Sequence, residues 1–115
     1  MIFQKKDNDD LVVNLPSLSR KEALILEMLS SSGRELYGLE MVEASNGALK
    51  RGTIYVTLQR MQEKDLIGSK QEPRSAPEIG IARRLYWISG HGARVLAAHQ
   101  AASSAFKMAL VPNGD

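Results

Sequence analysis

The order of hydrophobic patterns along the 115 residues is the feature that most constrains how this chain can fold. Ser19 and Glu22 form a capping box, and the broad apolar face that follows predicts a helix ending in Ser30-Ser31-Ser32-Gly33. A second, shorter helix is predicted from about Gly38 to Ser45, closed by Asn46-Gly47. Two short helices in a row need a third element to cover their apolar faces.

The third element, KRGTIYVTLQRMQEK at residues 50–64, has an ambiguous pattern. Its front half holds five strand-favouring residues whose apolar positions alternate. Ile54, Leu58 and Met61 nevertheless lie at i, i+4 and i+7, on one face of a helix. We predict a helix, because a strand would leave the first two helices without a packing partner and the second half consists of good helix formers.

Two strands and a long helix are predicted after residue 64. Leu66–Gln71 and Ile81–Ile88 read as strands around a turn-rich segment, Pro73–Gly80, and Ser89 caps a helix from about Gly90 to Leu110. Three helices, a two-stranded β-hairpin and a final helix form the winged helix-turn-helix layout, a mainly α (α+β) fold. In that layout the third helix of the three-helix core enters the major groove of DNA, beside the two-stranded β-wing.

Composition excludes several function classes. With 43% apolar and 24% charged residues the chain is typical of soluble globular proteins, and no apolar run approaches the ~18 residues of a membrane span. Residues 1–10 do not form a signal peptide, because no apolar segment follows their charges. The absence of cysteine excludes disulfides and thiolate sites and favours a cytoplasmic location. Neither histidine has a carboxylate at ligand spacing, so we predict no metal, no cofactor, no catalytic residues and no enzyme activity.

Positive charge is concentrated in the middle of the chain. Residues 50–84 contain eight Lys or Arg against four Asp or Glu, whereas residues 1–49 contain five against eight. Such a local excess suits a polyanion such as nucleic acid, although a chance imbalance of surface charge explains it equally well.

Four segments together resemble the PadR family of bacterial transcriptional regulators. They are LSRKEALILEML, LYGLEMVE, GTIYVTLQRMQEKDLI and RRLYWISGHG, and the resemblance covers about residues 18–98. The central pattern G-T-x-Y-x-x-L-x-x-M-x-x-x-x-L-I makes the ordered set specific. The resemblance implies a homodimeric winged helix-turn-helix repressor of the short type, with a single C-terminal helix for dimerisation.

The start of the third helix departs from that family pattern. Lys50-Arg51 stand where the family often has Ser-Pro. Cations at a helix N-terminus oppose the macrodipole unless an anion such as a DNA phosphate lies there. We therefore expect Lys50 and Arg51 to face DNA, the alternative being that they point into water. Gly52 would let the backbone approach a phosphate, or would serve packing against the second helix.

The residues expected to bind DNA lie on the outer face of the third helix and on the wing. Tyr55 either contacts phosphate, which the family resemblance favours, or is a half-buried core ring, whereas Tyr37 is expected to pack in the core. Val56 suits a thymine methyl, and we expect two of the four wing cations to contact DNA. The full predicted set is Lys50, Arg51, Gly52, Thr53, Tyr55, Val56, Thr57, Arg60, Lys70, Arg74, Arg83 and Arg84.

An apolar stripe on the last helix predicts a homodimer, because a chain this small cannot cover the stripe alone. Two-fold symmetry then implies a palindromic operator, whereas local packing of a frayed tail is the alternative. Trp87 either packs beneath the wing or against the last helix, or lines a pocket for an apolar small-molecule effector between protomers. The stripe consists of Val95, Leu96, His99, Ala102, Phe106 and Leu110.

We therefore predict an N-terminal arm (1–17), a DNA-binding domain (18–88), a dimerisation helix (89–111) and a short tail (112–115). The predicted function is a sequence-specific regulator of transcription, a repressor, whose partners are double-stranded DNA and a second copy of the chain. The alternatives are a winged-helix protein-interaction module and a small-molecule chemosensor. A neutral surface on the third helix would have favoured the interaction module, but Lys50, Arg51 and Arg60 make it basic.

Overall fold

The first helix begins and ends where its sequence signals predict. The computed structural model describes residues 17–72 and 83–110. The first element in this part of the chain is helix α2 (Arg20–Ser32). Ser19 Oγ accepts from the Glu22 amide at 3.1 Å, and the Ser19 amide donates to Glu22 Oε1 at 3.0 Å. Gly33 ends the helix with a φ of 66°, a left-handed conformation that glycine adopts without strain.

Helices α3 (Gly38–Ala44) and α4 (Ile54–Glu63) complete the three-helix core. Ile54, Leu58 and Met61 are all buried, so the helical interpretation of this segment is confirmed. The predicted start was too early, because α4 begins at Ile54 and not at Lys50. Without a Ser-Pro start, residues 51–53 form a turn, closed by the Ile54 amide donating to the Lys50 carbonyl at 3.0 Å.

The sheet has three antiparallel strands in the order β1-β3-β2, where only two were predicted. Strands β2 (Ile67–Gln71) and β3 (Arg84–Ile88) form the wing, with Ser69 opposite Tyr86. The missed strand is β1 (Leu36–Tyr37), which pairs with β3. Two residues are too few to show an alternating pattern in the sequence.

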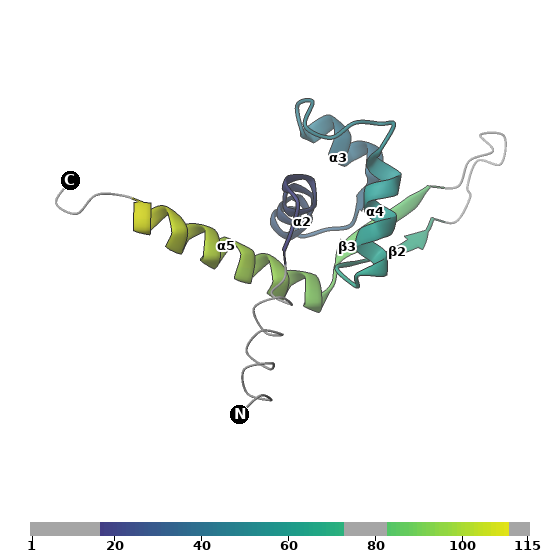
Figure 1. Cartoon of the computed structure of the whole chain (residues 1–115). Coiled ribbons are helices and arrows are strands. Elements are labelled where there is room, and N and C mark those ends of the chain that lie inside the picture. The colour runs from purple at the N-terminus through teal and green to yellow at the C-terminus, as the bar shows by residue number, and fades with distance from the viewer. Residues whose placement is uncertain (1–16, 73–82, 111–115) are drawn as a thin grey trace, which may run out of the picture.

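Helix α5 (Gly90–Leu110) starts against the body and then extends away from it (Figure 1). Ser89 Oγ caps it by accepting from the Gly92 amide at 2.8 Å, as its sequence predicts. A Cβ at residue 92 would lie 2.0 Å from the Leu66 carbonyl oxygen, so only glycine allows this close approach. No helix in the described part of the chain is long and apolar enough to cross a membrane.

The core lies between α2, α3, α4, the start of α5 and one face of the sheet. Ile25, Leu26 and Met41 are fully buried there beside the apolar face of α4. At its edge, Lys64 at the end of α4 donates to the buried carboxylate of Glu22 at 2.8 Å. This ion pair links the C-terminal end of α4 to the first turn of α2.

Candidate nucleic-acid interface

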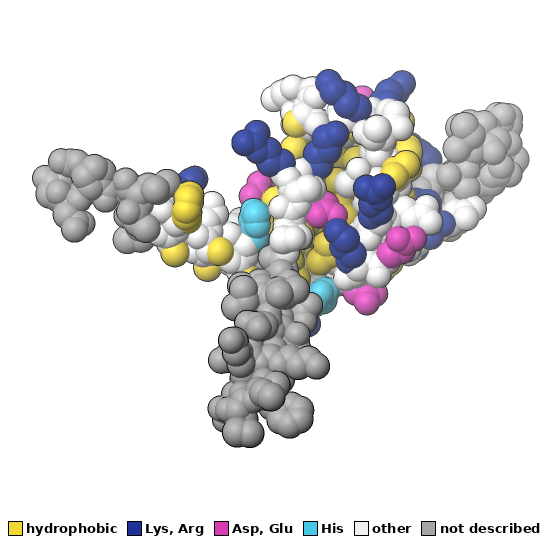
Figure 2. Space-filling view, viewed as in Figure 1, with side chains coloured by type: hydrophobic (Ala, Val, Ile, Leu, Met, Phe, Trp, Pro, Cys, Tyr) yellow, Lys and Arg dark blue, Asp and Glu magenta, His cyan; other side chains and the backbone are white. Residues whose placement is uncertain are grey.

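The outward face of α4 carries the residues that its helical period assigns to it. Tyr55 and Val56 are 50% and 56% exposed, and Arg60 is also exposed. Thr53 is exposed and Thr57 half-buried, and the Thr57 hydroxyl donates to the Thr53 carbonyl at 3.2 Å. Lys and Arg side chains gather on the side of the molecule that carries α2 and α4 (Figure 2).

The segment Lys50–Thr53, which we call the pre-helix turn, presents unpaired charge beside this face. Lys50 and Arg51 are exposed, and neither has a carboxylate within 4.0 Å among the described residues. Thr53 makes no side-chain cap, and the Tyr55 and Val56 amides find no backbone acceptor within residues 17–72 and 83–110. Two cations and two N–H groups are thus available to an anion.

Gly52 has room around it on every side. A Cβ at this position would meet nothing within 4 Å, and its φ is not in the left-handed region. The alternative that Gly52 serves packing against the second helix is therefore wrong. Neither packing nor backbone conformation in the described residues requires a glycine here.

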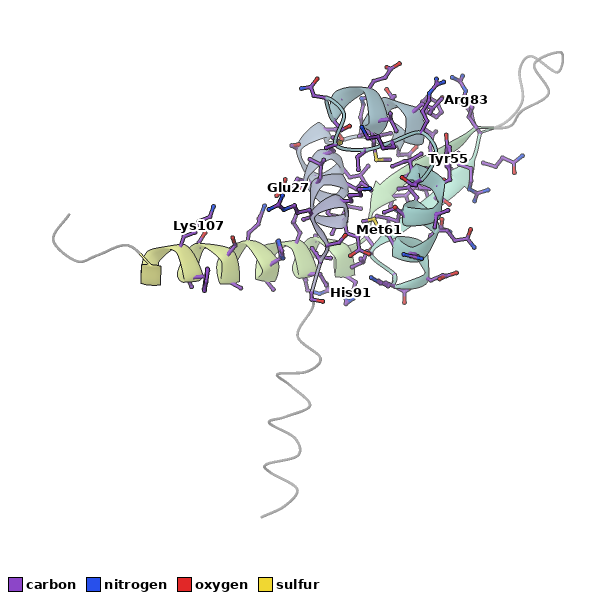
Figure 3. The ribbon with its side chains drawn as sticks, turned by 45° about the horizontal axis from the view of Figure 1, so that its top comes forward. Glu27, Tyr55, Met61, Arg83, His91 and Lys107 are labelled. Carbon is purple, nitrogen blue, oxygen red and sulfur yellow. The ribbon has the colours of Figure 1, made fainter. Side chains whose placement is uncertain are left out.

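Tyr55 combines the two roles that the sequence left open. Its ring packs against Gly38 at the start of α3, where a Cβ would lie 2.9 Å from Tyr55 Cε1. Half of the residue nevertheless remains exposed, so it is accessible to a ligand (Tyr55 is labelled in Figure 3). This packing gives a physical reason for glycine after Tyr37 in LYGLEMVE.

Two wing cations are already paired with carboxylates. Lys70 Nζ lies 3.3 Å from Glu35 Oε1, and Arg83 Nη2 lies 3.5 Å from Glu72 Oε1. We call these four residues the wing base. Arg74 lies outside the described residues.

Tyr37 packs against the wing base and not in the core, so the expectation of core packing was wrong. It is half-buried, its ring lies 4.5 Å below the Arg83 guanidinium, and its hydroxyl donates to Glu72. That hydrogen bond is the main cause that raises the pKa of Tyr37. Tyr37 faces outward because β1 pairs it with Leu85, on the side of the sheet away from the core.

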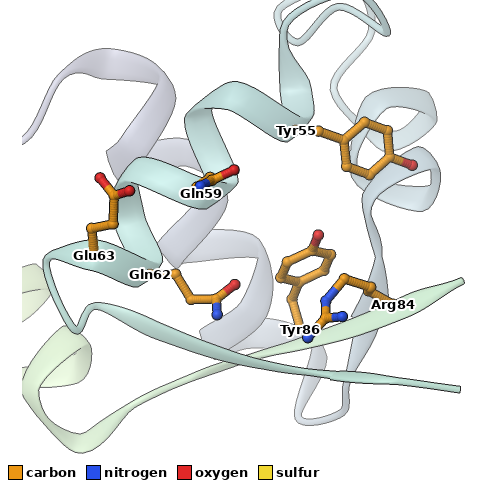
Figure 4. Close-up of a pocket in the computed structure, with 6 residues that line it drawn as sticks. All are labelled: Tyr55, Gln59, Gln62, Glu63, Arg84 and Tyr86. Carbon is orange, nitrogen blue, oxygen red and sulfur yellow. The ribbon is translucent and has the colours of Figure 1, made fainter.

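Arg84 points to the opposite side of the sheet, into a groove beside α4. Its Nε and Nη2 atoms donate to Ser69 Oγ at 3.2 and 3.0 Å. The groove has a volume of about 520 Å³ (Figure 4). Its lining consists of Tyr55, Gln59, Gln62, Glu63, Arg84 and Tyr86.

Trp87 lies on the outer face of the wing and not beneath it. It covers Gly68 of β2, where a Cβ would lie 2.5 Å from the indole ring, and is 36% exposed. The expectation that it packs beneath the wing was wrong, because alternation along β3 turns Tyr86 inward instead.

The stripe on α5 divides into two parts. Val95 and Leu96 are buried in the core of their own chain, and His99 is half-buried. Ala102 and Phe106 are exposed, Phe106 to 65%. The side chain of Leu110 lies outside the described part. Among the described residues, no three His, Asp or Glu side chains are placed to hold a metal ion.

Sequence reasoning missed Glu35, Glu72, Ser69 and Gln62. Each forms an ion pair or a hydrogen bond with a residue that is not its neighbour in the sequence, as Ser69 does with Arg84. Glu72 directly follows a predicted strand, which was the available signal for one carboxylate, whereas no local pattern marks Glu35. No local pattern marks Ser69 or Gln62.

Comparison with family models identifies one family. Residues 25–98 match the model of the transcriptional regulator PadR-like family. A PadR family transcription regulator from Clostridium difficile R20291 is 26% identical, with a TM-score of 0.65 over 77% of this chain and 92% of that one. A PadR-like transcriptional regulator from Bacillus cereus strain ATCC 14579 is 26% identical, with a TM-score of 0.56 over 79% and 92%.

A PadR family transcriptional regulator from Eggerthella lenta DSM 2243 shares the fold over more of the chain. It is 20% identical, with a TM-score of 0.63 over 96% of this chain and 94% of that one. Comparison with curated proteins found no match.

Proposed function

Since this chain belongs to the PadR-like family, whose members are DNA-binding regulators of transcription and not enzymes, we propose that it is a homodimeric repressor that binds a palindromic operator. The observation that carries the proposal is the pre-helix turn, where Lys50 and Arg51 have no carboxylate partner among the described residues. Phosphate binding there would place the exposed face of α4 in the major groove.

The proposed contacts fall into two classes. Lys50, Arg51 and the backbone at Gly52 bind phosphates and set the position of α4, without reading sequence. Arg60 and the threonines reach base edges, and Val56 contacts a thymine methyl. We retain the whole predicted set as the proposed interface, including the wing residues Lys70, Arg74, Arg83 and Arg84.

The proposed dimer forms through the outer part of α5. Ala102 and Phe106 are exposed on a helix that extends from the body, and most of the stability of a helix in a protein comes from packing one face against a partner. A second copy would cover this face by two-fold symmetry. Residues 18–88 would then serve as the DNA-binding unit and residues 89–111 as the dimerisation helix.

Selection from a pool of random-sequence duplexes tests the DNA-binding proposal. We expect an inverted repeat to be enriched, and its affinity, measured by fluorescence anisotropy, to fall steeply with salt. Failure to enrich any duplex, together with an affinity that does not respond to salt, would instead favour a protein-interaction module.

Two further measurements test the finer points. Light scattering should give the mass of a dimer, and Phe106→Asp should give a monomer; a monomeric wild type would contradict the dimer. A reporter placed behind the selected duplex should lose expression when the protein is supplied. Increased expression would indicate an activator.

A further inference from the structure

The groove between α4 and the wing contains an arginine that is held in one orientation. Ser69 Oγ accepts from Arg84 Nε and Nη2 and itself donates to Gln62 Oε1 at 2.9 Å. The chain of contacts therefore runs from α4 through β2 to β3. One edge of the guanidinium is used in this way, and Nη1 has no acceptor among the described residues. An arginine fixed by one edge keeps its other donors for a ligand.

Tyr86 supplies a second donor to the same groove. The residue is only 4% exposed, yet it lines the groove, and its hydroxyl, which is not itself buried, makes no hydrogen bond within the part of the chain that the structure describes. Burial is the main cause that raises the pKa of Tyr86, so the hydroxyl keeps its proton at neutral pH. A phenol whose ring is held in the core and whose O–H opens into a groove can donate to an incoming acceptor.

The position of the groove indicates what that acceptor is. If α4 enters the major groove and the wing reaches the adjacent minor groove, the sugar–phosphate strand that separates them must pass between α4 and the wing. The groove lies between these two elements, with Tyr55 of α4 on one side and Tyr86 and Arg84 of β3 on the other (Figure 4).

We propose that Arg84 and Tyr86 bind one phosphate of the DNA strand that runs between α4 and the wing, and that Ser69 and Gln62 are positioning residues for Arg84. This inference rests on the proposed function. Glu63 is the one carboxylate in the groove lining and lies at the opposite end from Arg84 (Figure 4), so the phosphate binds at the Arg84 end. The contact fixes the wing relative to α4 and carries no sequence information.

A phosphate scan of the selected duplex tests this contact directly. Each phosphate is replaced in turn by an uncharged methylphosphonate, and the affinity of each duplex is measured by anisotropy. We expect one phosphate in each half-site whose replacement weakens wild-type binding roughly tenfold. Arg84→Gln should bind the unmodified duplex about as weakly, and replacement of that phosphate should cause it no further loss. Tyr86→Phe keeps the ring, and its affinity for the unmodified duplex should be about threefold lower than that of wild type. Replacement of the same phosphate should then weaken its binding less than it weakens wild-type binding.

Variants that retain the charge test the positioning role. Ser69→Ala leaves Arg84 in place but releases its guanidinium, so we expect the affinity to fall severalfold. The slope of log affinity against log salt should decrease by up to about 0.9 per chain. Arg84→Lys should not restore binding, because an ammonium group has no fork to bond Ser69 and the phosphate together. Ser69→Ala combined with Arg84→Gln should bind no more weakly than Arg84→Gln alone.

Arg83→Gln is the matched control, since it removes the same charge from the residue just before β3, whose guanidinium lies over Tyr37 and not in the groove. Replacement of the phosphate assigned to Arg84 should weaken the binding of this variant by the same factor as it weakens wild-type binding. An Arg84→Gln chain that keeps the full wild-type pattern overturns the phosphate contact alone, while the proposed function stands. A wild-type chain that selects no duplex overturns the proposed function and this contact with it.

Discussion

The pre-helix turn and the wing base both carry two cations, but their surroundings differ. Lys50 and Arg51 have no carboxylate within 4.0 Å among the described residues, whereas Lys70 and Arg83 lie beside Glu35 and Glu72. A phosphate approaching the wing base must compete with those carboxylates, and one approaching the pre-helix turn need not. A count of the cations in the wing therefore overestimates the positive charge that is available to DNA phosphates.

The largest effect on binding is expected from the pre-helix turn. Lys50→Ala combined with Arg51→Ala should lower the affinity of the dimer for the selected duplex on the order of a hundredfold at low salt. The temperature of thermal unfolding should stay unchanged or rise slightly, because both side chains are exposed and their charges oppose the helix macrodipole. If the double variant keeps wild-type affinity, this turn does not bind phosphate, and the contrast with the wing base does not hold.

Lys64 represents a third situation, a cation whose partner is buried, and its removal should affect stability more than binding. In Lys64→Ala the Glu22 carboxylate, with a side chain 8% exposed, loses a hydrogen bond. We expect the free energy of unfolding to fall by about 1–2 kcal/mol, measured by urea titration. Lys21→Ala, an exposed cation on the same helix as Glu22, is the control and should change stability little.

The same pair predicts how stability depends on pH. Burial raises the pKa of Glu22, but hydrogen bonds from Lys64 and Ser19 outweigh it, and the pKa lies below its ordinary value of 4.5. Folding therefore favours the ionised carboxylate, which contributes stability above pH 4.5 that is lost as the pH falls through the lowered pKa. Glu22→Gln should be less stable at neutral pH and should lose less stability on acidification. An equally steep acid dependence in the variant would contradict this assignment.

Releasing the wing cations should strengthen binding. Glu35→Gln combined with Glu72→Gln removes both carboxylates while keeping side chains of similar size, and the glutamine oxygen can still accept from Tyr37. We expect the affinity for the selected duplex to rise about fivefold at low salt and to depend more steeply on salt. Unchanged binding would mean that the wing base lies away from DNA.

The smallest effect is expected at Gly52. Gly52→Ala places a methyl group in open space, so stability should stay constant or rise by about 0.4–1 kcal/mol through the unfolded state. If DNA backbone approaches this position closely, affinity should fall about two- to threefold. A variant that gains stability and keeps full affinity would show that the backbone at Gly52 does not meet a phosphate.

Much of the fold could be predicted from local signals. The Ser19–Glu22 capping box, Gly33 at the helix end and the Ser89 cap each act within a few residues, so their patterns are visible in the sequence. The spacing of the apolar residues in α4 predicted a helix although the segment is rich in strand-favouring residues. The spacing was the better guide because packing of a buried face outweighs intrinsic secondary-structure propensity.

The electrostatics of the site could not be predicted in the same way. The pairing of Lys70 with Glu35 and of Tyr37 with Glu72 depends on β1, which is too short to have a pattern. The orientation of Arg84 likewise depends on the register that brings Ser69 beside it. Charges distant in sequence neutralise one another only once the sheet has formed.

The most direct test of the central claim is the salt dependence of binding in two charge-matched double variants. Lys50→Ala/Arg51→Ala and Lys70→Ala/Arg83→Ala each remove two cations, and both are compared with wild type on the selected duplex. We predict that the first lowers the slope of log affinity against log salt by about 1.8 per chain, and the second by less than half as much. Equal decreases, or a larger decrease for the wing pair, would contradict the account.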